Sequence, residues 1–215
     1  MPVQFTTLKD YKDDAGNSLA TGENVRFSSS TLSFKEKKSS VTIGRNVQIN
    51  TCQIEIGRNS ELFIGDECFL SGKLTVGLNS RIWIGGGLSV TKNLTARAVE
   101  STFIEIGEDC LFGSDIVIRT TDGHPVYDAA TGQRINQSRS IKIGRHVWIA
   151  DRAVVLKGVE IGNASIVGVG SVVTKSVGNN CITAGNPARV VRTGVTWERS
   201  PSMHTAEFYM ADAED

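Results

Sequence analysis

Residues 143–178 read IGRHVW IADRAV VLKGVE IGNASI VGVGSV VTKSVG when they are divided into groups of six. A gapless period of this kind is typical of a solenoid, in which one repeat cannot bury its apolar side alone. The first position of every group is a β-branched aliphatic residue, and the fifth is small or β-branched. Both positions are therefore expected to face the interior. The first positions are Ile143, Ile149, Val155, Ile161, Val167 and Val173, and the fifth positions are Val147, Ala153, Val159, Ser165, Ser171 and Val177.

Each group of six combines a short strand with a turn. Residues 147–149 alternate in, out and in, which is the two-residue period of a β-strand. Glycine occupies the expected turns at Gly144, Gly162 and Gly168. Because glycine adopts a positive φ without steric cost, these turns account for much of a total of 22 glycines.

The same pattern continues upstream with looser spacing. No stretch between residues 41 and 192 has the three- or four-residue apolar period of a helix. Three six-residue faces give a coil of about 18 residues, and successive coils stack about 4.8 Å apart through parallel pairing. Steps of seven or eight residues predict wider turns upstream. The upstream groups begin at Ile43, Ile56, Ile64, Leu70, Val76, Ile84, Ile106 and Phe112.

The periodicity divides the chain into three parts. Residues 1–40 form a strand-like segment, residues 41–192 form the β-helix with a loop inserted at 119–140, and residues 193–215 form a tail. The tail carries Trp197 and Phe208 before an acidic end. Two alternatives stay open for it: packing against a neighbouring subunit, or fraying.

The composition excludes several functional classes. The chain has 215 residues with 23 basic and 23 acidic side chains, so its formal net charge is zero and it lacks the broad basic field that nucleic-acid binding requires. No apolar run approaches the roughly 18 to 20 residues of a membrane span. The N-terminus lacks the apolar core of a signal peptide, so we expect a cytoplasmic protein. The cysteines show no CxxC pair or metal spacing, and we expect reduced packing residues at Cys52, Cys68, Cys110 and Cys181.

Three segments, IGRHVWIA, GVGSVVTK and AGNPARVVR, resemble the left-handed parallel β-helix acyltransferases with hexapeptide repeats. The resemblance covers about 150 of the residues. It implies an all-β fold, a left-handed parallel β-helix of hexapeptide repeats with one extended catalytic loop. It also implies a homotrimer with an acetyl-CoA site in each groove between subunits.

The inserted loop contains His124 between Gly123 and Pro125. Long loops without secondary structure are usually functional or disordered, and histidine titrates near neutrality. In the acetyltransferases that this chain resembles, the catalytic histidine lies in such a loop, 24 residues before the tryptophan of a VWIG-like motif. His124 and Trp148 have the same interval. The resemblance therefore implies that His124 is a general base; the alternative is a surface histidine without a function.

Trp148 occupies an outward position, so it needs a partner outside the core. That partner is either a neighbouring subunit or the substrates, and the resemblance implies that the indole lies near the thioester and the acceptor. His146 in a turn and His204 in the tail are interpreted as surface residues. A zinc carbonic anhydrase on this fold needs three histidines, whereas the repeats hold only His124 and His146, so we expect no metal.

Coenzyme A presents phosphates and a pantetheine arm, which cations and backbone hydrogen bonds can hold. The resemblance places Lys175 and Arg189 near the phosphates, Val169 and Thr174 along pantetheine, and backbone N–H groups near the thioester. Lys175 and Arg192 have the alternative of being solvated charges in turns. The full set that the resemblance assigns to acetyl-CoA is Trp148, Ala150, Asp151, Val169, Thr174, Lys175, Arg189 and Arg192. Ala150 replaces the usual glycine of VWIG.

The segment before the repeats helps to choose among the acetyltransferases that this chain resembles. Residues 15–42 show neither the helical domain nor the helical hairpin that precedes the β-helix in other relatives. This arrangement most resembles the capsular and exopolysaccharide O-acetyltransferases, including those that act on polysialic acid. We therefore expect direct transfer from acetyl-CoA to a carbohydrate hydroxyl. The alternatives are N-acetylation of an amino sugar or a small xenobiotic, and a non-catalytic β-helix that serves in assembly.

Overall fold

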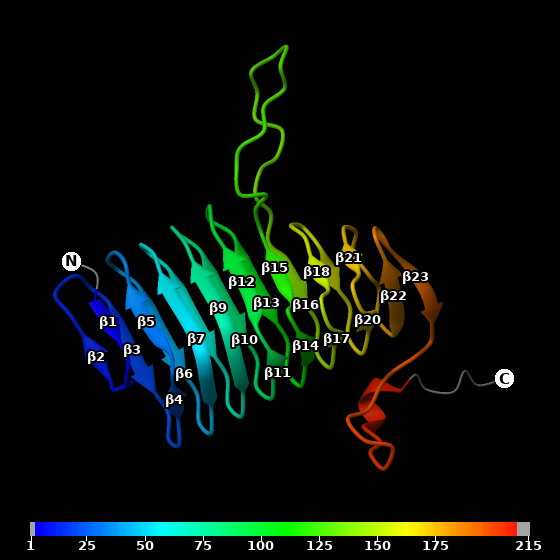
Figure 1. Ribbon diagram of the computed structural model, residues 1–215, viewed down its shortest axis with the longest axis horizontal. Coiled ribbons are helices and arrows are strands. Elements are labelled where there is room, and N and C mark those ends of the chain that lie inside the picture. The colour runs from blue at the N-terminus through cyan, green and yellow to red at the C-terminus, as the bar shows by residue number, and fades with distance from the viewer. Residues whose placement is uncertain (1–2, 210–215) are drawn as a thin grey trace.

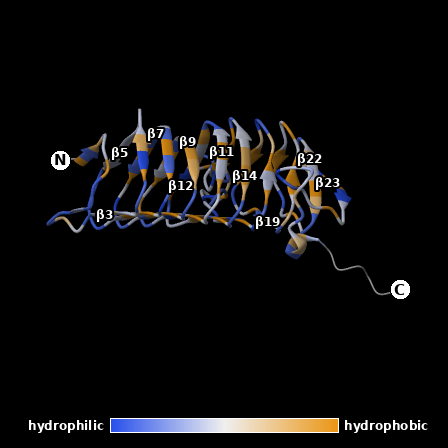
Figure 2. Cartoon of the chain, turned by 90° about the horizontal axis from the view of Figure 1, so that it is seen from below, coloured by the Kyte–Doolittle hydropathy of each residue, from blue (hydrophilic) through white to orange (hydrophobic). Residues whose placement is uncertain are grey.

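The computed structural model describes residues 3–209 as a three-sided prism of stacked coils, with the N-terminal coil at one end of the long axis and the C-terminal coil at the other (Figure 1). Each coil passes through three faces in turn, here called face 1, face 2 and face 3. Face 1 contains β2 (Tyr11–Lys12), β3 (Ser18–Thr21), β6 (Ser40–Ile43), β8 (Glu61–Ile64), β10 (Arg81–Ile84), β13 (Phe103–Ile106), β16 (Ile141–Ile143) and β19 (Glu160–Ile161). Figure 2 shows this face edge-on, from β3 to β19.

Faces 2 and 3 are joined because β7 (Gln48–Ile56) and β9 (Phe69–Val76) continue around the edge between them. Face 2 contains β4 (Arg26–Ser28), the first parts of β7 and β9, β11 (Ser89–Lys92), β14 (Leu111–Ser114), β17 (Trp148–Ile149), β20 (Ile166–Val167) and β22 (Cys181–Gly185). Face 3 contains β5 (Thr31–Phe34), the second parts of β7 and β9, β12 (Leu94–Ala98), β15 (Val117–Arg119), β18 (Val154–Val155) and β21 (Val172–Val173).

The hexapeptide positions behave as the sequence predicts. All six first positions are at most 2% exposed, and all six fifth positions are at most 6% exposed. Successive coils pair in parallel and in register, as with Ile149 beside Val167 and Val155 beside Val173. The expected all-β fold class, a left-handed parallel β-helix of hexapeptide repeats with one extended loop, is confirmed.

The coils differ in length along the prism. Lys142 pairs with Glu160, which is the coil of 18 residues that six-residue faces predict. Upstream, Glu61 pairs with Arg81 and Arg81 with Phe103, so these coils have 20 and 22 residues. The additional residues lie in the turns, as the looser upstream spacing predicts.

The reason given above for the turn glycines is wrong at Gly144, Gly162 and Gly168. None of the three has a positive φ. Instead, the coils approach so closely that a Cβ on Gly144 would lie 2.8 Å from the Asn163 nitrogen, and one on Gly162 would lie 2.5 Å from the Gly178 carbonyl carbon. Gly144 and Gly162 therefore require glycine because of interstrand distance, whereas the nearest atom to a Cβ on Gly168 would be the Ala184 Cβ at 3.1 Å.

The left-handed conformations occur mainly at other residues. Each edge of the prism carries a column of residues with positive φ. Asparagine is several-fold enriched in this conformation, and it recurs in these columns. The column between faces 1 and 2, here called the 1/2 edge, contains Asn24, Asn46, Glu67, Gly87, Asp109, His146, Ala164 and Asn180.

The coils begin before residue 41. β3 pairs in parallel with β6, β4 with β7 and β5 with β7, so residues 18–34 of the strand-like segment form a first coil. Both ends carry antiparallel strands. β1 (Val3–Phe5) pairs with β5 and β2 pairs with β3, while β23 (Ala188–Thr193) pairs with β22.

Two segments leave the prism on different sides (Figure 1). The loop between β15 and β16, residues 120–140, projects from the edge between faces 3 and 1, here called the 3/1 edge. The tail after β23 turns to the opposite side of the view and includes the short 3₁₀ helix η1 (Ala206–Phe208). This division determines where functional side chains can meet.

All four cysteines are free and buried, as expected for packing residues. Burial raises the pKa of Cys52 and Cys110 to about 12 and that of Cys68 to about 11, so these thiols stay protonated. Over residues 3–209, we find no helix with the length and apolar character of a membrane span.

Two adjacent glycines provide a test of the coil spacing. A Cβ on Gly85 would lie 2.8 Å from the Glu108 nitrogen, whereas a Cβ on Gly86 would have its nearest neighbour, the Asp66 carbonyl oxygen, at 3.2 Å. We expect Gly85→Ala to lower the melting temperature by about 4 to 8 °C, which corresponds to overpacking of about 2 kcal/mol. Gly86→Ala is the control and should shift it by less than about 3 °C. Equal shifts in differential scanning fluorimetry would contradict the role of close approach.

Candidate active site

His124 is exposed on the projecting loop, and within residues 3–209 its ring makes no hydrogen bond to another group. The flanking backbone is fixed, because the Asn136 side chain donates to the His124 carbonyl oxygen at 2.9 Å. An imidazole that is free at both nitrogens on a braced backbone can accept a proton from a ligand.

Ion pairs attach the loop to the prism at two points. Lys157, on the following coil, pairs with the Asp122 carboxylate, and Glu100 accepts hydrogen bonds from Arg134 at 2.8 Å and Ser138 at 2.7 Å. The hydrogen bond from Lys157 is the main cause of a lowered pKa at Asp122. Hydrogen bonds from Ser138 and Arg134 lower the pKa of Glu100. Both carboxylates are thus ionised acceptors at neutral pH.

Trp148 points outward from face 2 and is 37% exposed. Its ring packs at a tilt against Trp197 of the tail, with 6.2 Å between the ring centroids. The partner that an outward tryptophan needs is therefore supplied in part by the same chain, and the rest of the indole is open to a ligand or another subunit.

The interpretation of His146 as a surface residue is wrong. It is 1% exposed and stacks between Trp197 and Phe208, with centroid distances of 4.3 and 4.2 Å. One ring nitrogen lies 2.6 Å from an Asp109 carboxylate oxygen and the other lies 2.6 Å from the Trp197 carbonyl oxygen. Each ring nitrogen thus faces an oxygen atom, and the ring is held on both edges as well as on both faces.

The tail is held by these contacts. Trp197 donates from its indole to the His146 carbonyl oxygen at 2.8 Å, and Arg199 donates to Asp109 at 2.8 Å. The described part of the tail packs on its own β-helix, a contact that neither of the two sequence-based alternatives included. Sequence reasoning missed this because the partners are 51 residues apart.

Four of the residues assigned to acetyl-CoA lie along the edge between faces 2 and 3, here called the 2/3 edge. Asp151 and Gly170 stack there, since the Gly170 N–H donates to the Asp151 carbonyl oxygen at 2.9 Å. The next coil continues this column with Gly185, whose N–H donates to the Ser171 hydroxyl at 3.1 Å. The assigned residues at this edge are Ala150, Asp151, Val169 and Arg189.

The backbone N–H groups of Ala150 and Asp151, which are expected near the thioester, differ in whether they have a hydrogen-bond acceptor. The Ala150 N–H donates to the Val167 carbonyl oxygen at 2.9 Å, so it belongs to the ladder between coils. For the Asp151 N–H, the structure of residues 3–209 contains no hydrogen-bond acceptor, although the Asp151 carboxylate accepts from the Ser114 N–H at 2.5 Å. The Asp151 N–H is therefore the one of the two that lacks an acceptor within residues 3–209.

The remaining assigned residues lie elsewhere. Thr174 and Lys175 are exposed at the 3/1 edge directly after β21, and Arg192 is exposed near the end of β23. His124 also projects from the 3/1 edge, two coils away, whereas Trp148 lies within face 2. Within one chain, Asp151 and Val169 therefore lie at the same edge, whereas His124 and Trp148 lie on different parts of the prism.

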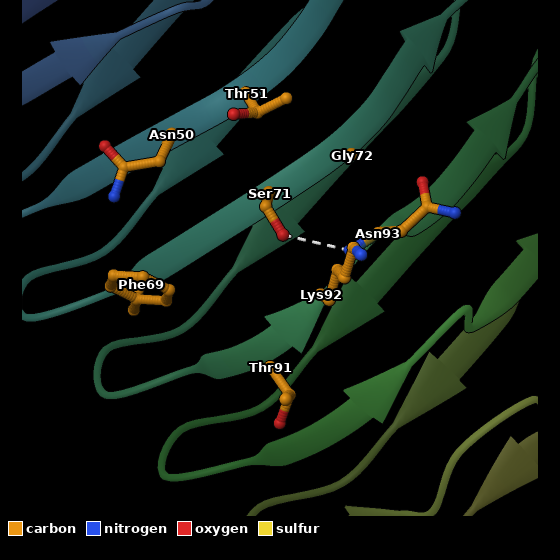
Figure 3. A pocket seen from close by; sticks show the side chains of 8 residues that line it. All are labelled: Asn50, Thr51, Phe69, Ser71, Gly72, Thr91, Lys92 and Asn93. Atoms are coloured by element: carbon orange, nitrogen blue, oxygen red, sulfur yellow. Dashed lines mark hydrogen bonds between the residues drawn. The ribbon is translucent and has the colours of Figure 1, made fainter.

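A pocket of about 360 Å³ lies where faces 2 and 3 meet in the upstream coils (Figure 3). Most of its lining surface is apolar, with Phe69 in the wall, and hydroxyl, amide and ammonium groups supply the polar remainder. The pocket is lined by Asn50, Thr51, Phe69, Ser71, Gly72, Thr91, Lys92 and Asn93. The hydroxyl of Ser71 accepts from the Asn93 N–H at 2.9 Å, which holds the rim in place.

The repeats and the whole fold both match known proteins. Residues 140–175 match the bacterial transferase hexapeptide (six repeats) family. The solved structure of the polysialic acid O-acetyltransferase OatWY is 30% identical to this chain with a TM-score of 0.79, and the match covers 89% of this chain and 99% of that one. The chain belongs to the hexapeptide-repeat acetyltransferases.

Two further relatives of this hexapeptide-repeat acetyltransferase have named activities. A polysialic acid O-acetyltransferase of Escherichia coli O1:K1 / APEC is 29% identical over 147 residues, 68% of this chain and 45% of the relative. A galactoside O-acetyltransferase of Escherichia coli (strain K12) is 33% identical over 129 residues, 60% of this chain and 62% of the relative. The chain thus spans less than two thirds of the length of either relative.

In this hexapeptide-repeat acetyltransferase, we expect Trp197→Ala to release the tail from His146. Trypsin should then cleave after Arg199 at least about tenfold faster, because local opening exposes the bond. Mass spectrometry of a digestion time course measures the rate. Met203→Ala, at a side chain 45% exposed, is the control and should keep the wild-type rate. Unchanged cleavage in Trp197→Ala would show that other contacts hold the tail.

Proposed function

We propose that the protein is an acetyl-CoA-dependent O-acetyltransferase that modifies a carbohydrate hydroxyl, with an acidic polysaccharide such as polysialic acid as the acceptor. The observation that carries the proposal is the exposed His124 imidazole on a loop that two ion-paired anchors attach to the β-helix. Membership of the acetyltransferase family supports the reaction class.

His124 acts as general base and then as general acid. A ring nitrogen accepts the proton of the acceptor hydroxyl while the hydroxyl oxygen attacks the thioester carbonyl carbon. The tetrahedral intermediate breaks the carbon–sulfur bond, and the imidazolium returns the proton to the departing coenzyme A sulfur. The products are the acetyl ester and the free thiol of coenzyme A, so no acyl-enzyme forms.

The 2/3 edge provides the groups that the donor needs. The Asp151 N–H, which has no acceptor within residues 3–209, can donate to the oxyanion of the intermediate. Val169 is exposed one coil further along, in line with an extended pantetheine arm. Lys175, Arg189 and Arg192 are exposed cations that can bind the phosphates.

The acceptor assignment draws support from the pocket in Figure 3. Lys92, Asn93 and Thr91 contribute an ammonium, an amide and a hydroxyl group to the lining, and Phe69 offers an apolar surface. A carboxylated sugar needs a cation and several hydrogen-bonding groups around an apolar contact. The names of the relatives, polysialic acid and galactoside O-acetyltransferases, agree with this class of acceptor.

We further propose a homotrimer whose active sites lie between subunits. Faces 2 and 3 each carry a ladder of outward apolar side chains in the downstream coils, which a monomer would leave half exposed. A second copy would cover them and bring one His124 towards another copy's Trp148. The ladders are Leu111, Trp148, Ile166 and Ile182 on face 2, and Val117, Val154 and Val172 on face 3.

We expect His124→Ala to lower kcat by about 10²- to 10⁴-fold, because it removes the general base. Release of coenzyme A thiol from acetyl-CoA, measured with polysialic acid and with neutral polysaccharides as acceptors, gives the rate. His204→Ala, at an exposed histidine of the tail, should leave kcat unchanged. A loss of less than about tenfold in His124→Ala would refute the assignment of the base. Turnover with neutral polymers alone would refute the acidic acceptor.

Mixed trimers test whether the sites lie between subunits. We expect His124→Ala and Trp148→Ala trimers each to be inactive. When both chains are co-expressed with different affinity tags and doubly tagged trimers are purified, one site in three lacks both substitutions, so about a third of wild-type turnover should return. Doubly tagged trimers of His124→Ala alone are the control. Failure to recover activity would place both residues of a site in one chain.

A further inference from the structure

One side chain in the loop makes hydrogen bonds with every polar atom it has. The Asn136 amide nitrogen donates to the Asp122 carboxylate at 2.8 Å and to the His124 carbonyl oxygen at 2.9 Å. Its oxygen accepts from the Val126 N–H at 2.7 Å and from Arg134 at 3.3 Å. A primary amide has two N–H donors and two lone pairs, so all of its capacity is used. The partners also fix which end is nitrogen, because a carbonyl oxygen only accepts and a backbone N–H only donates.

Two of these bonds hold the backbone on both sides of Pro125. One is to the carbonyl of His124 and the other is to the N–H of Val126. Proline fixes its own φ and has no N–H, so it cannot contribute a hydrogen bond of its own. The amide of Asn136 therefore determines the direction in which the Cα–Cβ bond of His124 leaves the loop.

The other two bonds connect the amide to the anchors. Asp122 pairs with Lys157 of the following coil, and Arg134 pairs with Glu100 of an earlier coil at 2.8 Å. Asn136 thus lies between two ion pairs that reach the prism from opposite directions. These contacts set the position of the backbone at His124 relative to the β-helix.

We propose that Asn136 is a positioning residue, which holds the His124 imidazole at the place and angle required for proton removal. The inference rests on the proposed role of His124 as general base. Asn136 touches neither substrate in this account and acts only through His124. A general base must lie within hydrogen-bond reach of the proton, and a misplacement of about 1 Å can cost about 10²-fold in rate.

Two substitutions of Asn136 distinguish a role in positioning His124 from a role in filling space within the loop. Asn136→Ala removes all four hydrogen bonds, whereas Asn136→Asp keeps the shape and the oxygen acceptor but loses both N–H donors. We expect both variants to lower kcat by about 10- to 100-fold and to leave the KM for acetyl-CoA within about threefold of wild type. Circular dichroism and the trimer mass report whether each variant is folded.

A matched control lies at the tip of the same loop. The Asp128 side chain accepts hydrogen bonds from the Ala130 N–H at 3.1 Å and from the N–H and hydroxyl of Thr131 at 2.7 and 2.9 Å. Asp128→Ala thus removes a similar number of bonds without touching the backbone at His124. We expect it to keep kcat within about threefold of wild type.

A double mutant decides whether Asn136 acts through His124. If it does, adding Asn136→Ala to His124→Ala lowers kcat no further. The kcat of the double variant and the kcat of His124→Ala then agree within about twofold. A full additive loss would overturn the inference. So would kcat within about threefold of wild type in both folded Asn136 variants while His124→Ala is inactive. If His124→Ala itself stays active, the proposed function fails first, and that result is distinguishable from either outcome.

Discussion

The distance between stacked coils constrains every other feature of this protein. Adjacent coils are separated by the distance between two hydrogen-bonded β-strands. In the turns that follow face 1, this distance leaves no room for a Cβ, as at Gly85 and Gly144. The same spacing stacks equivalent inward positions of successive coils, where β-branched residues fill the first positions and small or β-branched residues fill the fifth, all at most 6% exposed. Residues 143–178 show a strict period because these two requirements recur in every group of six.

The regular ladder uses the backbone hydrogen-bonding groups almost completely, so chemistry is restricted to the places where the ladder is interrupted. Ala150 illustrates this restriction, since its N–H is committed to Val167, whereas the Asp151 N–H beside it is free within residues 3–209. The loop at residues 120–140 is the largest interruption, and it carries its own network of side-chain bonds in place of ladder bonds. Rigidity at His124 thus comes from side chains and not from β-sheet pairing.

The parts that sequence predicts well are those that depend on neighbours in the chain. The inward positions, the parallel coils, the inserted loop and the buried thiols all follow from local pattern. His146 does not, because its burial depends on Trp197 and Phe208, which the pattern of the repeats does not relate to it. The bonds of Asn136 were missed for the same reason. Only the fold of the loop brings this residue next to His124, 12 positions earlier.

The antiparallel strands at the two ends of the prism have a consequence for solubility. A stack of parallel coils presents unpaired backbone groups at its first and last coil, and these groups invite another molecule to continue the stack as a fibre. β1 and β2 cover faces 3 and 1 at the first coil, and β23 covers face 2 at the last. Because these strands run against the direction of the coils, an added molecule cannot extend the parallel pairing there. Parallel pairing therefore ends within the molecule on faces 1 and 3 at the first coil and on face 2 at the last.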